Sequence, residues 1–331
     1  MSGFDLKEGF YKVQRASEDE LWSAFTSLFS SQTTMVSSYK YGFLKAIIDN
    51  LYNVDAGLVL SFDQLFSKFA EIYWNLILKH KLNQQAKKET YLEQILKETV
   101  IRYDLPEGVP FESLGPDIMI EVSHQVKIKC KKYVVGALFE DTKQLFYSFS
   151  RTGEWLKINP QMYEFICKHK VSIEKLNYYE WARFLERVND GGGVDHLLSK
   201  IDESAKRNNL SYYRDILFEE FEKKCFYCGK KVSLGNVEVD HFIPWSFIKD
   251  DNLWNFVLAC PECNNKKRDK LADKRYLLEL VERNSEIVIE THSDMRNYQQ
   301  ESLMKIYNWA MQNGYSKIWT PSIKRAETDN G

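Results

Sequence analysis

The sequence predicts an α+β protein that is predominantly helical and has two domains. Three observations lead to this prediction. Apolar side chains recur at helical spacing over much of the first 131 residues. Short runs rich in β-branched and aromatic residues follow between residues 133 and 158. Close pairs of cysteines then occur in the last third of the chain. With 331 residues, 44% of them hydrophobic and 28% charged, the composition is that of a globular chain long enough for two domains.

The N-terminal part of the chain is predicted to be a helical bundle. The pattern is helical from Glu18 to about Tyr103. Its clearest signal is Ser61-Phe62-Asp63-Gln64, a capping box, which is followed by apolar residues at helical spacing. Other segments with apolar residues on one face predict further helices. These segments are Tyr39–Leu51, Tyr91–Val100 and Ile118–Lys131.

A small antiparallel sheet is expected next, followed by a domain boundary. The runs Tyr133–Phe139, Leu145–Ser148 and Trp155–Ile158 are separated by residues typical of turns. Helices are then expected at Tyr163–Cys167 and Tyr178–Val188. The sequence Asn189-Asp190-Gly191-Gly192-Gly193 suits flexible or left-handed backbone. We therefore predict a helical domain with a small sheet over residues 1–189 and a second domain over residues 190–331.

Helices are also expected in this second domain. They are predicted at Val194–Lys206, Tyr212–Glu222 and Gln299–Met311, and the tail Ala326–Gly331 is expected to fray.

The formal net charge of −2 means that any surface that binds nucleic acid must be local. No basic segment followed by an apolar run opens the chain. The most apolar stretch, around Ile72–Leu78, is too short to span a bilayer and contains Asn75. We therefore expect a cytoplasmic protein that has no membrane partner. The sequence does not indicate an oligomeric state.

Four of the six cysteines form two Cys-x-x-Cys pairs, Cys225 with Cys228 and Cys260 with Cys263. In a chain of a reducing compartment this pattern predicts a structural zinc site rather than disulfides. Such a site adds folding energy directly. The segment between the pairs is longer than in a minimal zinc ribbon, so a further element must lie between them.

Several polar residues lie between and just after these pairs. Asp240-His241 and Asn255 precede the second pair, and Asn264 directly follows its last cysteine. The combination resembles the HNH endonuclease family in its zinc-ribbon, four-cysteine form, over about residues 212–277. The resemblance implies a ββα-metal nuclease domain that hydrolyses phosphodiester bonds. It favours DNA over RNA as the substrate. Many family members have a final histidine where this chain has Asn264, so the chain is an His-Asn-Asn variant.

The resemblance also implies a role for each motif residue. His241 would be the general base that takes a proton from the attacking water. Asp240 and Asn264 would hold a catalytic divalent ion, Mg²⁺ or Mn²⁺. Asn255 would tie the catalytic loop together and orient His241. Asn265 is the alternative to Asn264 as a metal ligand.

A basic run follows the last cysteine, on what the family makes a helix. It consists of Lys266, Lys267, Arg268 and Lys270. We predict that these residues contact phosphates beside the cut. The alternative is a solvated helix face.

Two other functional hypotheses remain open. The chain could be a zinc-dependent nucleic-acid-binding module without catalysis, which would bind in a salt-sensitive manner but would not cleave. A further hypothesis keeps the nuclease and makes residues 1–189 a recognition, regulatory or partner-binding unit, as in restriction or anti-phage defence.

Overall fold

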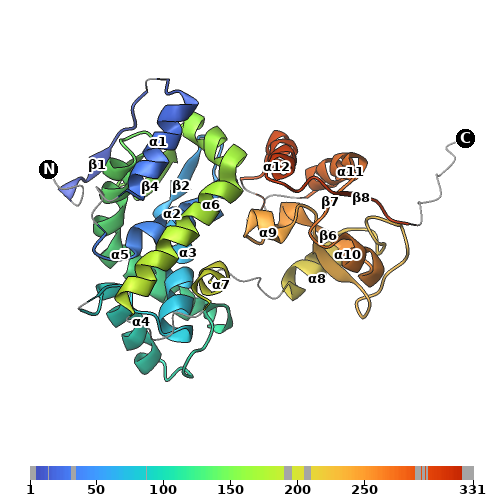
Figure 1. The fold of residues 1–331 in the computed structure, drawn as a ribbon. Coiled ribbons are helices and arrows are strands. Elements are labelled where there is room, and N and C mark those ends of the chain that lie inside the picture. Colours follow the sequence, from blue (N-terminus) through green and yellow to red (C-terminus); the bar gives the residue numbers. More distant parts are fainter. Residues whose placement is uncertain are drawn as a thin grey trace, which may run out of the picture. The chain divides into compact units, whose positions relative to one another are not determined.

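The computed structural model describes residues 5–13, 15–30, 35–86, 88–189, 196–204, 210–287, 292, 295 and 297–322. The chain forms two compact units, residues 1–206 and 207–331, and each is described by itself (Figure 1). The division lies beyond the predicted boundary at Asn189. The reason is that the short helix α7 (Leu197–Asp202) packs against α6 (Pro160–Val188) of the first unit. The predicted glycine-rich interruption, the ends of the predicted helix at 194–206 and the predicted frayed tail lie outside the described residues.

The first unit is built mainly from helices, as predicted. Its longer helices are α1 (Glu18–Leu28), α2 (Tyr39–Asp49), α3 (Phe62–Trp74), α4 (Tyr91–Arg102), α5 (Pro116–Asp141) and α6. Its shorter helical segments are η2 (Leu51–Asn53), η3 (Asn75–Lys79) and η4 (Phe111–Ser113). The predicted capping box at the start of α3 is present, since the Ser61 side chain accepts from the Gln64 amide and the Gln64 side chain accepts from the Ser61 amide.

The prediction of a strand at Tyr133–Phe139 is wrong, because α5 continues through this segment to Asp141. The buried residues Val126, Cys130, Val134 and Leu138 follow one another at intervals of four and lie on one helix face. This face packs in the bundle, where α5 contacts α3 and α4. The β-branched residues of the segment favour a strand only weakly, and tertiary packing decides the outcome.

The predicted antiparallel sheet is present in the first unit. Its strands are β1 (Glu8–Gly9), β2 (Val59–Ser61), β3 (Tyr147–Ser150) and β4 (Trp155–Ile158), in the order β1-β3-β4-β2. All of its pairings are antiparallel, and Phe149 lies opposite Leu156 at its centre. The two edge strands are too short to give an alternating pattern in the sequence.

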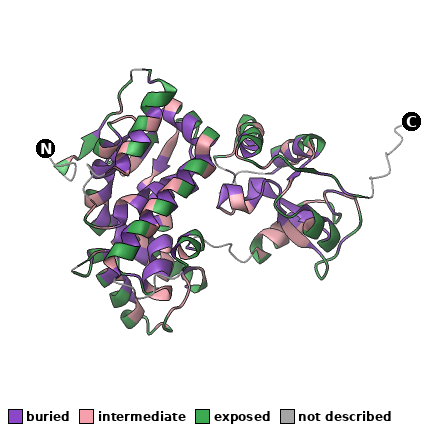
Figure 2. Cartoon of the chain, viewed as in Figure 1, coloured by how far each residue is buried: buried purple, intermediate pink, exposed green. Residues whose placement is uncertain are grey.

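Many aromatic side chains are buried in the core of the first unit, which is consistent with the high aromatic share of the sequence. Helices α2 and α3 are buried along most of their length (Figure 2). The rings of Phe69 and Tyr73 lie 4.6 Å apart, and Tyr73 also contacts Trp181 of α6. Among the helices of the described residues, none has the length and apolar character needed to cross a membrane.

The second unit is organised around a β-hairpin followed by a helix. Strands β5 (Glu238–His241) and β6 (Phe256–Ala259) pair antiparallel, with His241 opposite Phe256. Helix α10 (Pro261–Lys267) follows at once and contacts β5. The surrounding elements are α8 (Ser211–Glu220), α9 (Trp245–Ile248), η5 (Leu253–Asn255), β7 (Leu271–Ala272), α11 (Lys274–Ser285), α12 (Gln300–Gln312) and β8 (Ile318–Trp319). The hairpin and α10 together form a ββα unit.

Candidate functional site

The four paired cysteines come together in one cluster. The sulfurs of Cys225, Cys228, Cys260 and Cys263 all lie within 4.8 Å of one another. The sulfurs of Cys228 and Cys260 are 3.9 Å apart. A tetrahedral zinc ion with Zn–S bonds of about 2.3 Å sets its sulfurs about 3.8 Å apart. The cluster therefore has the composition and the spacing of a structural zinc site.

Each cysteine pair is held by a local turn. In the first pair, the amide of Gly229 donates to the carbonyl of Cys225 at 2.9 Å, and Gly229 has a left-handed φ of 73°, which favours glycine. In the second pair, Cys260 caps α10, and Pro261 occupies the first helical position. Burial, and then the neighbouring Cys225, raise the pKa of the Cys263 thiol far above its usual range. A divalent cation would supply the positive charge that four thiolates need.

Two acidic side chains of β5 point toward α10. Glu238 and Asp240 are two residues apart in the strand, so both point to the same side. Asn264 and Lys267 are three residues apart in α10 and lie on one helix face. Asn264 Nδ2 donates to Glu238 Oε2 at 2.7 Å, and Lys267 Nζ lies 2.9 Å from Asp240 Oδ2. The structure thus brings Asp240 and Asn264 to the same strand–helix interface.

Asp240 is 5% exposed and is held through one of its two oxygens. The Tyr227 hydroxyl donates to Oδ2 at 2.5 Å, and Lys267 Nζ contacts the same atom. Burial, and then the charge of Asp240, raise the pKa of Tyr227 well above its usual range, so this hydroxyl stays protonated and can donate. Within the described part of the chain, Oδ1 accepts no hydrogen bond.

His241 ends β5 and is almost fully enclosed. Its Nε2 lies 2.8 Å from Oδ1 of Asp251, and the two side chains are 8% and 4% exposed. The ring of Phe256, the residue opposite it in the hairpin, meets the imidazole edge to face with centroids 4.7 Å apart. The ring is therefore fixed by one polar contact and one aromatic contact.

Asn255 is fully buried just before β6, and it is hydrogen-bonded to the segment that follows β5. Its Oδ1 accepts from the amide of Ile243 at 2.8 Å, and its Nδ2 donates to the carbonyl of Ile243 at 2.9 Å. Its own carbonyl accepts from the amide of Phe242 at 2.8 Å. These bonds hold Phe242 and Ile243, the two residues that follow His241. Asn255 therefore fixes the backbone directly after β5.

The predicted phosphate contact of Lys267 is wrong. This side chain is fully buried, and besides Asp240 it contacts the carbonyl of His241 at 2.7 Å. The helical repeat turns it inward beside Asn264, whereas Lys266 and Arg268 are exposed and Lys270 is partly exposed. Asn265, the alternative metal ligand, is also exposed.

Three contact partners are missed when only the sequence is considered. Tyr227 lies inside the first cysteine pair, where a buried aromatic residue is unremarkable. Asp251 follows His241 by ten residues and belongs to an acidic pair, Asp250-Asp251, that looks like a surface turn. Glu238 precedes Asp240 by two residues, and this strand spacing is the one sequence signal that could have revealed a shared face.

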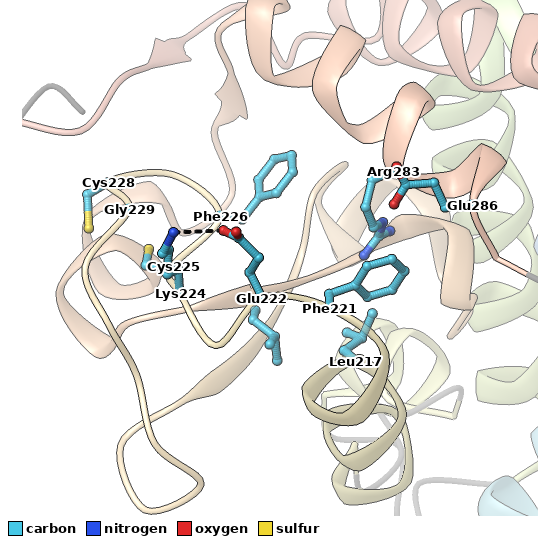
Figure 3. Close-up of a pocket in the computed structure, with 11 residues that line it drawn as sticks. Leu217, Phe221, Glu222, Lys224, Cys225, Phe226, Cys228, Gly229, Arg283 and Glu286 are labelled. Atoms are coloured by element: carbon cyan, nitrogen blue, oxygen red, sulfur yellow. Dashed lines mark ion pairs between the residues drawn. The ribbon is translucent and has the colours of Figure 1, made fainter. Parts of the chain in front are cut away.

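A cleft of about 520 Å³ lies beside the first cysteine pair (Figure 3). The residues that line it include Leu217 of α8, Phe221 directly after this helix, the first cysteine pair and Arg283 of α11. The Arg283 guanidinium stacks over the Phe221 ring at 4.9 Å, and Glu222 pairs with Lys224 at 2.9 Å. The described lining includes none of Asp240, His241 and Asn264, so this cleft is separate from the face described above.

Comparison with known proteins identifies the segment that carries this geometry. Residues 225–272 match the family model described as HNH endonuclease, which confirms the resemblance over the cysteine cluster and the ββα unit. No curated protein and no solved structure matches the chain. The HNH segment indicates a nuclease in general, with a nucleic acid as its substrate, and HNH nucleases generally use a divalent metal.

Proposed function

We propose that this protein is a metal-dependent endonuclease that hydrolyses the phosphodiester bonds of DNA at the ββα unit. The observation that carries the proposal is the position of Asp240, His241 and Asn264. They belong to the HNH segment, and Asp240 and Asn264 both lie at the interface where α10 covers β5. A purely structural zinc knuckle has no need for an acid, an imidazole and an amide in this arrangement.

Asp240 and Asn264 are the proposed ligands of the catalytic ion. Asn264 uses its Nδ2 on Glu238, which leaves its Oδ1 as an acceptor, and the described contacts of Asp240 leave its Oδ1. Carboxylate and amide oxygens are hard ligands that suit Mg²⁺ or Mn²⁺. When bound, such an ion neutralises charge on the scissile phosphate and on the departing oxygen. Asn265 is the less suitable ligand because its side chain is exposed.

His241 is the proposed general base. Its imidazole takes a proton from the water that attacks phosphorus, and the bond from phosphorus to the 3′ oxygen breaks. By family resemblance, the products carry 5′-phosphate and 3′-hydroxyl ends. Asn255 supports this step without touching the substrate, because it fixes the backbone next to His241.

The exposed cations of α10 and of the turn after it are the proposed phosphate contacts. Lys266, Arg268 and Lys270 supply a local positive charge that the net charge of the chain lacks. Lys266 also pairs with Glu262 at 2.7 Å, so this acidic neighbour reduces its contribution.

The biological setting we propose is restriction or anti-phage defence in the cytoplasm. In this setting the first unit recognises a partner or regulates cutting. The support is limited to its size and its own core, since residues 1–206 form a compact unit apart from the HNH segment. A plaque assay on cells that express the wild type or His241→Ala tests the idea. Equal phage titres on both strains would argue against it.

Cleavage of supercoiled plasmid tests the proposed activity. We expect purified protein to nick or linearise plasmid in Mg²⁺ or Mn²⁺, and we expect Asp240→Asn to abolish cutting while keeping its zinc. Salt-sensitive DNA binding without any cleavage by the wild type would instead favour the non-catalytic binding module. Cleavage of RNA but not of DNA would overturn the assignment of the substrate.

A further inference from the structure

The buried carboxylate of Asp251 contacts the imidazole of His241 at Nε2. Asp251 Oδ1 is 2.8 Å from His241 Nε2, and neither side chain is more than 8% exposed. An ionised carboxylate only accepts hydrogen bonds, so it requires a proton on the nitrogen that it faces. The pair therefore favours the imidazole tautomer that is protonated at Nε2 and has its lone pair at Nδ1.

The loop that presents Asp251 is fixed on both sides. Before it, α9 ends at Ile248, and the cap residue Lys249 adopts a left-handed φ of 62° and turns the chain back toward the hairpin. After it, the amide of Asn255 donates to the carbonyl of Asn252 at 2.9 Å and forms the turn that starts β6. The carboxylate is thus held by backbone geometry as well as by its contact with His241.

Aromatic packing also holds the pair in place. Phe256 contacts the His241 ring, and Tyr213 of α8 packs on Phe256 with ring centroids 4.7 Å apart. The Tyr213 hydroxyl also lies 3.5 Å from the Asp251 carbonyl. A surface turn with a chance acid–histidine contact would have none of this support.

We propose that Asp251 is a positioning residue of the nuclease centre, which sets the tautomer of His241 so that Nδ1 accepts the proton of the attacking water. The proposal rests on the proposed function. In the step, the water oxygen bonds to phosphorus and its proton goes to Nδ1. The bond to the 3′ oxygen breaks, and this oxygen keeps the electron pair and takes a proton from solvent. The imidazolium formed is stabilised by the adjacent Asp251 carboxylate. The proton on Nδ1 then passes to solvent.

The tautomer can be measured without substrate. Two-bond proton–nitrogen NMR correlations of the zinc-loaded full-length protein, at alkaline pH, distinguish the protonated from the unprotonated ring nitrogen. The signals of His241 are identified by their loss in His241→Ala. We expect the proton on Nε2 in the wild type. A proton on Nδ1, or an even mixture of the two tautomers, would overturn the proposal.

Kinetics provide the second test. For Asp251→Asn we expect kcat for plasmid nicking to fall by roughly 100-fold or more with KM unchanged, because the imidazole is misoriented while DNA contacts remain. Asp250→Asn makes the same charge change one residue earlier and should keep wild-type kinetics. Cleavage by Asp251→Asn within a few-fold of the wild type would contradict the proposal.

The two tests separate this inference from the proposed function. If the wild type does not cleave plasmid, the proposed function fails, and the NMR measurement still decides the tautomer. If Asp251→Asn loses its zinc or its fold, the wild-type NMR spectrum again decides. A functional centre in which His241 has its proton on Nδ1 would contradict only the role of Asp251.

Discussion

Lys266 and Lys267 are neighbours in the sequence with opposite environments. Lys266 is exposed and pairs with Glu262 across one helical turn, whereas Lys267 is fully buried against Asp240 and the carbonyl of His241. Removing one partner of a buried ion pair leaves an uncompensated charge, and this costs far more than the loss of an exposed pair. The same side-chain chemistry therefore has different consequences at the two positions.

We predict that Lys267→Met lowers the free energy of unfolding by about 3–5 kcal/mol, because Asp240 loses its buried cation. Lys266→Met should change it by less than about 1 kcal/mol. Urea unfolding of both variants, loaded with zinc and without Mg²⁺, measures the difference. Equal stability of the two variants would contradict the burial of Lys267.

Residue types and spacing single out the motif residues of this site, but not the partners that hold them. The cysteine pairs, Asp240-His241, Asn255 and Asn264 stand out because their order along the chain is distinctive. Burial of Lys267 depends on which face of α10 meets β5, and a helix of seven residues gives too short a pattern to decide this. Asp251 reaches His241 through a loop whose course is set by tertiary contacts.

At the scale of elements, the capping box at Ser61 and the cysteine spacing are the reliable signals. The box at Ser61 predicts where α3 begins, because it is a local hydrogen-bonding arrangement. Residues 133–139 show the reverse case. Their β-branched residues suggest a strand, yet the segment continues α5 because its buried face packs against α3. Propensity is weak evidence when a bundle can bury the same side chains.

The cations proposed to contact DNA lie on and just after α10. Arg268 and Lys270 follow the helix, and both reach solvent. We predict that replacing both with Ala weakens DNA binding and reduces the slope of log K against log salt by about 2, since each phosphate contact contributes about 1.

A salt titration of DNA binding, measured by fluorescence anisotropy with a catalytically inactive His241→Ala background, checks this prediction. A control pair in the first unit, Lys175→Ala with Arg183→Ala, removes the same charge. An unchanged slope in the Arg268 and Lys270 double variant would show that this surface does not contact DNA.

At the scale of the whole molecule, the two units differ in what stabilises them. Residues 1–206 contain a large aromatic core, as around Tyr73 and Trp181. Residues 207–331 form the smaller unit, in which the cysteine cluster brings the turn with Cys225 and Cys228 to the start of α10. A domain held by zinc depends on the metal for its folding energy.

We predict that a strong zinc chelator unfolds the second unit and leaves the first folded. Because the two units have separate cores, calorimetry should then show the loss of one transition and the persistence of the other. Hydrogen exchange provides the matching observation, with faster exchange in β5, β6 and α10 and unchanged protection in α2 and α3. Cooperative loss of both units on chelation would contradict separate stabilisation.

The central claim is that His241 is the base of a metal-dependent nuclease centre. Its most direct test is the rate of plasmid nicking by His241→Ala, with the zinc content verified and with His124→Ala of the first unit as the matched histidine control. We predict that His241→Ala cuts at least about 100-fold more slowly than the wild type while His124→Ala is unaffected. Wild-type cleavage by a zinc-loaded His241→Ala variant would contradict the account.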